Sequence, residues 1–316
     1  MKKPAGKVRD GLNESTRSYT EPMRPKNSGA GAARATGLPE LDARWADVKA
    51  GRLRYFVGGP VAADPLVLVH GLGGSASNWR ALAPLLAPRY RLLVPELPGH
   101  GGSSPLPAVP NLDAFAERIG LLAEREGLTP AVFVGHSLGG LVSLRLAIRR
   151  PKLVRGVVLA GSAGISSTAG RAKKALAVTT VVKPGRRLAP YRRSIARRPR
   201  LRSAVLRWGV ADAHALGPDV AESFLASPAA YTDLLSAATA LVADDVRRDL
   251  EDVRCPCLVV WGTRDLQTTF SDGLGFARRL GAPFRAIADC GHLVIGERAE
   301  ACADAIGEFV ALLGSR

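Results

Sequence analysis

Residues 135–139, with the sequence Gly-His-Ser-Leu-Gly, constrain the fold more than any other feature of the chain. A short apolar run at 131–134 precedes them, and the run at 141–147 has the apolar spacing of a helix. A serine in a G-x-S-x-G segment between a strand and a helix usually sits on a tight turn that projects its Oγ. Glycines suit such a turn because side chains beside the serine would collide with neighbouring backbone. The pattern therefore predicts a strand–turn–helix unit with Ser137 as a nucleophile.

A nucleophilic serine needs a base and a carboxylate that orients the base. The apolar run at 258–261 predicts a buried strand, and Asp265 follows its carboxyl end, the edge of a parallel sheet where ligands bind. A further short strand leads to the next loop on that edge, which carries His292. We therefore predict that His292 accepts the proton of Ser137 and that Asp265 orients His292. Asp289 is an alternative orienter in a less favourable position.

An oxyanion needs backbone N–H donors, and a glycine-rich loop allows one to approach the substrate. The strand predicted at 66–69 runs into such a loop at 70–74. We assign the donors as the N–H groups of Leu72 and Leu138. Residues near these donors are the candidates for substrate contact: Gly71, Gly73, His136 and Trp79.

Structural roles compete for several of these polar and aromatic side chains. His70, His100 and His136 lie in tight loops, where a histidine more often orients backbone by hydrogen bonding than transfers protons. Trp79 begins a predicted helix, so packing beneath the oxyanion loop is the alternative to substrate contact. His214 is expected at the surface.

With these motifs the chain resembles the α/β-hydrolase family over residues from about 45 to 314. A second family-like turn lies at 95–103, although Glu96 stands where relatives commonly carry Asp. The family order of serine, acid and histidine matches Ser137, Asp265 and His292. No acidic residue follows the run at 157–160, the family's other site for the triad acid, and this favours Asp265.

The resemblance, together with alternating strands and helices, implies an α/β fold. We expect a mostly parallel eight-stranded sheet with helices on both faces and an inserted helical cap. The predicted divisions are a disordered basic tail at 1–40, a core at 41–163 and 254–316, and a cap at 164–253. Within the core, the pattern predicts a β-hairpin through 45–57, a strand at 91–94, and helices near 79–86 and 112–126.

The apolar runs and cysteines suggest a location and exclude some chemistries. No apolar run reaches the ~18 residues of a membrane-spanning helix, and the first residues lack the apolar stretch of a secretory signal, so we expect a cytoplasmic protein. The four cysteines do not form a disulfide framework pattern, and no metal-ligand spacing is present. Neither a metal nor a cofactor is therefore predicted.

Charge is concentrated in one part of the chain. Residues 127–211 contain no Asp or Glu but 18 Lys or Arg, which exceeds the net charge of +16 for the whole chain. Such a field attracts anions, so a basic cap that meets an anionic membrane surface or an acidic substrate is one interpretation. A solvated, arginine-rich lid is the other, and nucleic acid is a weaker candidate because no recognition motif accompanies the charge. The acidic run at 244–252 is expected to be a solvated face.

The combined motifs predict a serine hydrolase that cleaves carboxylic esters through an acyl-enzyme intermediate. Serine at 137 argues against the family's dehalogenases and epoxide hydrolases, which use a carboxylate nucleophile. The same triad would serve a lipase, a lactonase, a thioesterase or a carbon–carbon bond hydrolase. A ligand-binding receptor with little turnover is a further alternative. The sequence does not predict the oligomeric state.

Overall fold

The computed structural model of the chain describes residues 37–38, 40–49, 51–106, 110–165, 187–230 and 233–314. Nearly all of the tail predicted at 1–40 lies outside the described residues, as does part of the predicted cap at 166–186.

Within the described ranges, eight strands form one sheet in the order β1-β2-β4-β3-β5-β6-β7-β8. The first two strands form the predicted hairpin, β2 pairs antiparallel with β4, and every other neighbouring pair is parallel. The predicted α/β class with a mostly parallel eight-stranded sheet is confirmed. The strands are β1 (Asp42–Asp47), β2 (Arg52–Gly58), β3 (Pro65–Val69), β4 (Arg91–Pro95), β5 (Ala131–His136), β6 (Val154–Ala160), β7 (Cys257–Gly262) and β8 (Phe284–Ile287).

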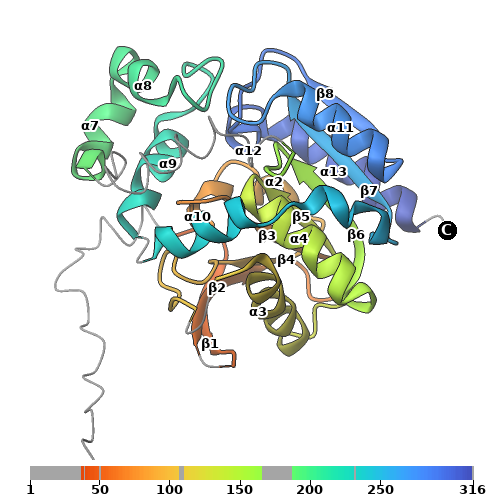
Figure 1. The fold of residues 1–316 in the computed structure, drawn as a ribbon. Coiled ribbons are helices and arrows are strands. Elements are labelled where there is room, and N and C mark those ends of the chain that lie inside the picture. The colour runs from red at the N-terminus through yellow and green to blue at the C-terminus, as the bar shows by residue number, and fades with distance from the viewer. Residues whose placement is uncertain are drawn as a thin grey trace, which may run out of the picture.

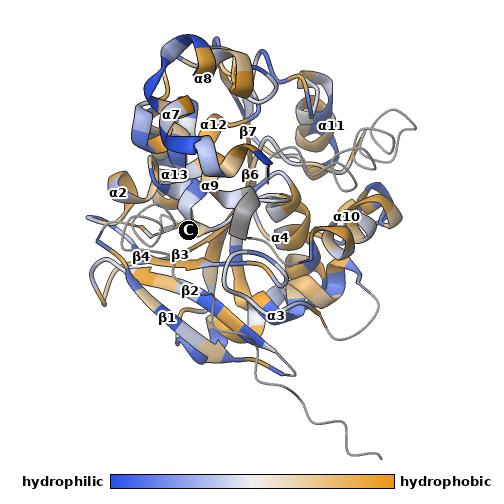
Figure 2. Ribbon diagram, turned by 90° about the vertical axis from the view of Figure 1, so that its left-hand side faces the viewer, coloured by the Kyte–Doolittle hydropathy of each residue, from blue (hydrophilic) through white to orange (hydrophobic). Residues whose placement is uncertain are grey.

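Helices cover both faces of this sheet (Figure 1). Side chains alternate along β3, so that Leu66 and Leu68 belong to one hydrophobic cluster and Val67 and Val69 to the other. The cluster around Val67 includes α3 (Leu112–Arg125), α4 (Leu138–Arg149) and α11 (Phe270–Leu280), whereas the cluster around Leu66 includes α2 (Ala83–Leu86), α12 (Val294–Glu297) and α13 (Ala299–Gly314). Burial on both faces explains why the central strands are continuously apolar, as Figure 2 shows.

One predicted core helix is wrong in its extent. In place of a continuous helix near 79–86, the chain forms a 3₁₀ turn η1 (Ala76–Trp79) and then the short helix α2. Pro84 lies in the first turn of α2, where its missing N–H and fixed φ are tolerated. The proline therefore marks a new helix start rather than the interior of one helix.

Between β6 and β7 the described chain is helical. It contains α7 (Arg192–Arg197), α8 (Pro199–Leu206), α9 (Pro218–Ala230) and α10 (Leu234–Ala243), and we call residues 187–243 the cap. Figure 1 shows α7, α8 and α9 gathered at one end of the molecule, while α10 returns along the core. Residues of α10 such as Ala237 and Leu241 belong to the hydrophobic cluster of α3 and α4.

The chain leaving the cap is held by a buried arginine of α4. The Arg145 side chain is 7% exposed, and its guanidinium donates to the carboxylates of Asp244 and Asp249. Burial by itself lowers the pKa of Arg145, but the hydrogen bonds that it donates to Asp244 and Asp249, with the charges of these two carboxylates, outweigh burial and raise it. The prediction that residues 244–252 form a solvated face is therefore wrong for these two aspartates, because the sequence spacing could not reveal their partner in α4.

Candidate active site

Ser137 occupies the turn between β5 and α4 with a backbone conformation that residues other than glycine rarely adopt. Its φ is +53° and its ψ is −118°, and its side chain is half-buried among fully buried neighbours. The flanking glycines are required by close backbone approach: a Cβ at Gly135 would lie 2.4 Å from the carbonyl oxygen of Gly139, and one at Gly139 would lie 2.0 Å from that of Val69. Backbone strain of this kind concentrates at functional sites.

Asp265 and His292 form a buried acid–base pair. The Nδ1–H of His292 donates to Oδ2 of Asp265 at 2.9 Å, and the side chains are 4% and 0% exposed. Since Nδ1 is the donor, Nε2 is the nitrogen available to accept a proton. This arrangement is the one that a serine-activating base requires.

The Asp265 carboxylate is surrounded by further donors. Its Oδ1 accepts from the backbone N–H groups of Gln267 and Thr268 at 2.8 and 3.0 Å, and the Thr268 hydroxyl donates to Oδ2 at 2.7 Å. Burial raises the pKa of Asp265, but His292 and these hydrogen bonds outweigh burial and hold the pKa below its ordinary value. Asp265 is therefore an anion held against the Nδ1–H of His292.

The sheet order brings the three predicted residues to one edge. Ser137, Asp265 and His292 follow the carboxyl ends of β5, β7 and β8, which lie in the parallel part of the sheet. Gly161 follows β6 between them, and a Cβ there would lie 3.5 Å from both Oδ2 of Asp265 and Nδ1 of His292. By contrast, the Asp289 side chain is 76% exposed and pairs with Arg264 at 3.6 Å.

The two predicted oxyanion donors lie beside the nucleophile. Leu138 is the first residue of α4, and a Cβ at Gly71, next to Leu72, would lie 3.0 Å from the Cβ of Ser137. Across the described segments, the N–H groups of Leu72 and Leu138 donate no hydrogen bond to the protein. Both are therefore free to donate to a bound oxygen.

Two buried histidines hold the glycine-rich loop in place. His70 donates from Nδ1 to the carbonyl of Gly71 at 2.8 Å and accepts from the N–H of Leu97 at 3.0 Å, and His100 Nε2 accepts from the N–H of Gly73 at 3.1 Å. Burial lowers the pKa of His70 to about 3 and that of His100 to about 4. Both imidazoles are thus neutral, and both orient backbone, as the structural alternative predicted.

The loop that carries His100 is organised by the buried Glu96. Oε2 of Glu96 accepts from the N–H of Gly102 at 2.6 Å, and Arg54 approaches it at 3.8 Å. A Cβ at Gly101 would lie 2.0 Å from this carboxylate, so only glycine fits there. Burial raises the pKa of Glu96. Glu96, which stands where relatives commonly carry the shorter Asp, thus fills the turn with its carboxylate.

His136 contacts His292, the predicted base. Its Nε2–H donates to the backbone carbonyl of His292 at 2.9 Å, and the two ring centroids are 4.9 Å apart. Burial, with the charge of His292 as a smaller cause, lowers the pKa of His136 to about 3. The observed contacts are those of a neutral residue that supports the His292 backbone.

The remaining side chains considered in the sequence analysis, Trp79 and His214, lie in the core and on the cap surface. Trp79 is fully buried in the hydrophobic cluster around Leu66, which favours the packing alternative over substrate contact. His214 is exposed on the cap, as expected. No cluster of potential metal ligands occurs among the residues with described positions.

Two residues at the site went unnoticed in the sequence. Thr268 follows Asp265 by three residues, a spacing at which an aspartate accepts hydrogen bonds from the following turn. Glu297 follows His292 by five residues and is buried against the base loop. The first had a local signal in the sequence, whereas the second depends on contacts with the cap.

The chain matches known proteins over most of its length. A family model described as the alpha/beta hydrolase family matches residues 66–305. Over 256 residues the chain is 35% identical to a pimeloyl-[acyl-carrier protein] methyl ester esterase of Aromatoleum aromaticum, and the match covers 78% of this chain and 97% of that protein. Several other curated relatives are matched over only 32–33% of their own length.

Solved structures show the same fold. An enol-lactonase from Burkholderia xenovorans LB400 superposes with a TM-score of 0.67 at 25% identity, covering 85% of this chain and 100% of that one. A thermophilic esterase from Thermogutta terrifontis superposes with a TM-score of 0.68 at 23% identity, covering 86% and 99%. The family match, the methyl ester esterase and the enol-lactonase support a hydrolase activity. Because the family model covers well over half of its residues, the chain belongs to the alpha/beta hydrolase family.

Proposed function

We propose that the protein is a serine hydrolase that cleaves carboxylic esters through an acyl-enzyme. Ser137 Oγ attacks the ester carbonyl while His292 Nε2 accepts its proton, and Asp265 stabilises the resulting imidazolium. The N–H groups of Leu72 and Leu138 stabilise the oxyanion. His292 then protonates the departing alcohol, and water activated by His292 releases the acyl group. The observation that carries this proposal is the buried 2.9 Å contact between Asp265 and His292 at the sheet edge that carries Ser137.

Two of the similar proteins favour a carboxylic ester over the other substrates that enzymes with this triad can cleave. The relative matched over nearly its full length is named as a methyl ester esterase, and an enol-lactone is a cyclic ester. If the protein did not hydrolyse esters, we would infer that it cleaves a thioester or a carbon–carbon bond, or that it binds a ligand without turnover.

Substrate profiling of the purified full chain tests the proposal. The panel contains p-nitrophenyl esters from acetyl to dodecanoyl, a lactone, an acyl thioester and a ring-fission dienoate. Ser137→Ala should lower kcat on the best ester by on the order of 10⁶, as for triad knockouts in other serine hydrolases. Ser143→Ala, in the helix α4 that follows the Ser137 turn, is the matched control. Unchanged hydrolysis by Ser137→Ala would refute the nucleophile, and a preference for the dienoate would refute the ester assignment.

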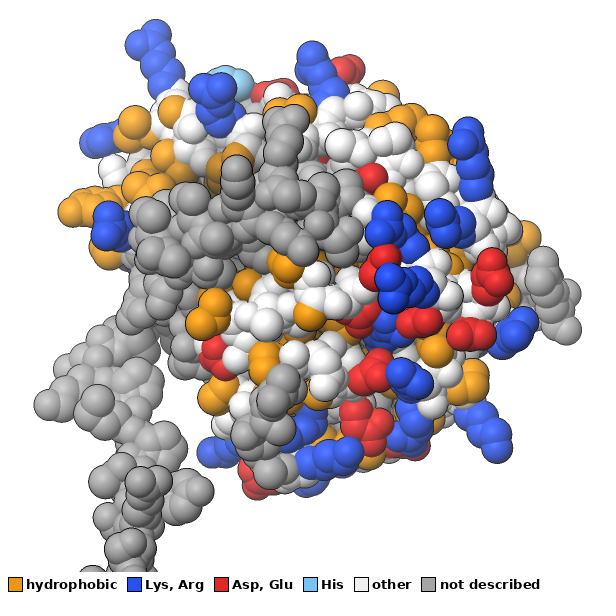
Figure 3. Space-filling view, in the orientation of Figure 1, with side chains coloured by type: hydrophobic (Ala, Val, Ile, Leu, Met, Phe, Trp, Pro, Cys, Tyr) orange, Lys and Arg blue, Asp and Glu red, His pale blue; other side chains and the backbone are white. Residues whose placement is uncertain are grey.

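We further propose that the cap meets an anionic membrane surface. Four exposed arginines lie along α7 and α8 and beside them: Arg197 ends α7, Arg198 lies between the two helices, Arg200 is in α8 and Arg207 follows it. They make no ion pair within the part of the chain that is described. Large apolar side chains are exposed among them: Tyr191 is 65%, Trp208 52% and Leu201 42% exposed. Figure 3 shows blue and orange side chains side by side at this end of the molecule. Aromatic and basic side chains together suit the headgroup region of an anionic bilayer.

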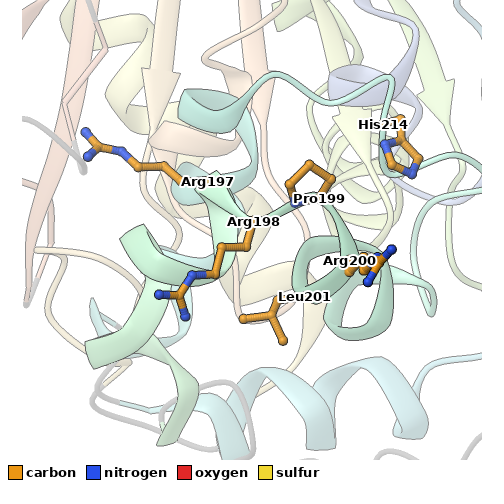
Figure 4. A pocket seen from close by; sticks show the side chains of 6 residues that line it. All are labelled: Arg197, Arg198, Pro199, Arg200, Leu201 and His214. Carbon is orange, nitrogen blue, oxygen red and sulfur yellow. The ribbon is translucent and has the colours of Figure 1, made fainter.

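Three of these arginines, Arg197, Arg198 and Arg200, also line a cavity of about 530 Å³ on the cap surface, together with Pro199, Leu201 and His214 (Figure 4). None of these lining residues belongs to the loops that carry the triad. The cavity is therefore a feature of the cap surface and is separate from the site of the chemistry. Arg193, in contrast, is paired with Glu222 at 3.2 Å.

Vesicle sedimentation tests this surface. The protein should bind vesicles of phosphatidylglycerol and phosphatidylcholine at low salt, release them at high salt, and ignore pure phosphatidylcholine. The triple variant Arg197→Gln, Arg198→Gln, Arg200→Gln should lose most of this binding. The control is Arg89→Gln, Arg248→Gln, Arg278→Gln, which removes the same charge from exposed positions outside residues 187–243. Equal loss in both variants, or no vesicle binding by the native protein, would reject the membrane assignment.

A further inference from the structure

The backbone of the cap lies directly against the loop that carries the base. The N–H of Leu293 donates to the carbonyl of Gly209 at 2.7 Å. A Cβ at Gly291 would lie 2.8 Å from the nitrogen of Ala211 and 2.8 Å from the oxygen of Gly209. His292 is therefore flanked on both sides by residues that touch the cap, and only glycine at 291 permits this approach.

A buried carboxylate joins the same two segments. Glu297 is 4% exposed, and its Oε1 accepts from the N–H groups of Ala211 and Asp212 at 3.0 and 2.7 Å. Its Oε2 accepts from the N–H of Gly291 at 2.8 Å and also lies 3.2 Å from the nitrogen of Ala211. Glu297 thus binds cap backbone with one oxygen and base-loop backbone with the other.

Both carboxyl oxygens of Glu297 are used as acceptors. Both oxygens of Glu297 face N–H groups, and no ion pair to Glu297 is found among the described residues. An amide at this position would direct its own NH₂ group at a backbone N–H, so one side of the contact would be lost. A buried anion without a cation is costly unless hydrogen bonds stabilise it, which indicates that the bridge is specifically built.

We propose that Glu297 is a positioning residue that couples the cap to the catalytic base. The inference rests on the proposed function, since it assigns His292 as the base. With Gly291 and Leu293 both tied to the cap, docking of residues 209–212 determines where the His292 backbone lies. His136 fixes the remaining side by donating to the His292 carbonyl. The segment at 209–212 is accordingly part of the catalytic framework.

The cap also contacts the oxyanion side of the site. Ser227 in α9 lies 2.9 Å from the Ser75 hydroxyl, and the Asn78 side-chain amide donates to the Ser227 hydroxyl at 2.9 Å. Asn78 Oδ1 in turn accepts from the N–H of Ser75, directly after the glycine-rich loop. The cap therefore braces both the base loop and the segment behind the oxyanion loop, so its position affects both halves of the machinery.

The substitution Glu297→Gln tests the coupling, with Glu300→Gln on the neighbouring helix as a charge-matched control. Glu300 is exposed. We expect kcat on the best ester to fall by roughly 10- to 100-fold in Glu297→Gln with KM within about threefold, because misplacement of a catalytic group acts on the chemical step. Hydrogen exchange measured by mass spectrometry should accelerate in peptides covering 209–212 and 290–293. Glu300→Gln should match the native protein in both measurements.

The substitution Gly291→Ala tests the same contact without changing charge. Its Cβ would force the cap backbone away, so it should reproduce the fall in kcat and the faster exchange at 209–212. Gly217→Ala is the control in the cap, since a Cβ there meets no atom within 4 Å. The proposal is overturned if both Glu297→Gln and Gly291→Ala keep native kcat and native exchange while Ser137→Ala is inactive. If Ser137→Ala remains active, the proposed function fails, and the exchange data alone still decide whether the cap and base loop are coupled.

Discussion

Asp265 and His292 share a buried hydrogen bond of 2.9 Å between Oδ2 and Nδ1. The Thr268 hydroxyl donates a second hydrogen bond to the same carboxylate oxygen. The acid–base pair is thereby held by the turn at 265–268 on one side and by the cap-braced loop at 290–293 on the other.

Removal of the charge on the orienter should disable the base. Asp265→Asn should lower kcat by on the order of 10⁴, because an amide favours the wrong histidine tautomer. Asp289→Asn, at the exposed rival position, should leave kcat within about twofold of native. Steady-state kinetics on the best ester measure both. The assignment would be reversed if Asp289→Asn were the damaging change.

Loss of the Thr268 hydroxyl should weaken the same pair. Thr268→Val removes the donor at 2.7 Å from Asp265 Oδ2, so the pKa of Asp265 should rise toward its ordinary value. We expect kcat to fall by about tenfold, in line with the loss of one hydrogen bond to a charged group. Thr268→Ser keeps the hydroxyl and should restore most of the activity. Equal activity in the valine and serine variants would show that the hydroxyl is dispensable.

Acid should destabilise the fold through its buried histidines. His70, His100 and His136 have pKa values lowered to about 3, 4 and 3, so the unfolded state binds protons that the native state does not. Stability should be complete above the ordinary pKa of about 6.5 and fall as the pH drops below it, by roughly 1.4 kcal/mol per pH unit for each histidine. The lowered pKa of Asp265 acts in the same direction at still lower pH.

Urea unfolding from about pH 7 to pH 5 measures this dependence. Replacement of one buried histidine, as in His100→Gln, should make the curve shallower, although it also lowers the stability at neutral pH. His214→Gln, on the exposed cap surface, should leave the slope native. A native protein with no loss of stability over this interval would contradict the buried, neutral state of the three imidazoles.

The nucleophile turn should not tolerate a methyl group. In Gly139→Ala the added Cβ would lie 2.0 Å from the carbonyl oxygen of Val69, so the turn would have to open. We expect a loss of more than about 3 kcal/mol in unfolding free energy or failure to fold, since overpacking against backbone cannot relax by rotamer change. Gly217→Ala, at a cap position where an added Cβ meets no atom within 4 Å, is the control and should keep native stability. A Gly139→Ala protein with native Tm and kcat would contradict the observed turn.

Local patterns in the sequence predicted the sheet and the positions of Ser137, Asp265 and His292 along it. Ser137 and Asp265 follow apolar runs and His292 follows a short predicted strand, and the edge of a parallel sheet collects such residues because its parallel strands point the same way. The same reasoning did not extend to 79–86, where Pro84 divided the expected helix. It also failed for Asp244 and Asp249, whose partner Arg145 is distant in the chain.

Strand ends, tight turns at glycines and the accumulation of charge could be predicted from neighbours a few residues apart in the chain. Three features became visible only in the folded chain: Glu297 joins the cap to the base loop, His136 supports the His292 backbone, and Trp79 belongs to the core. Each of these contacts joins segments far apart in the chain through backbone groups or buried surfaces. Backbone N–H and carbonyl groups occur at nearly every residue, so the sequence does not show which of them will pair. The pairing becomes specific only when the chain is packed.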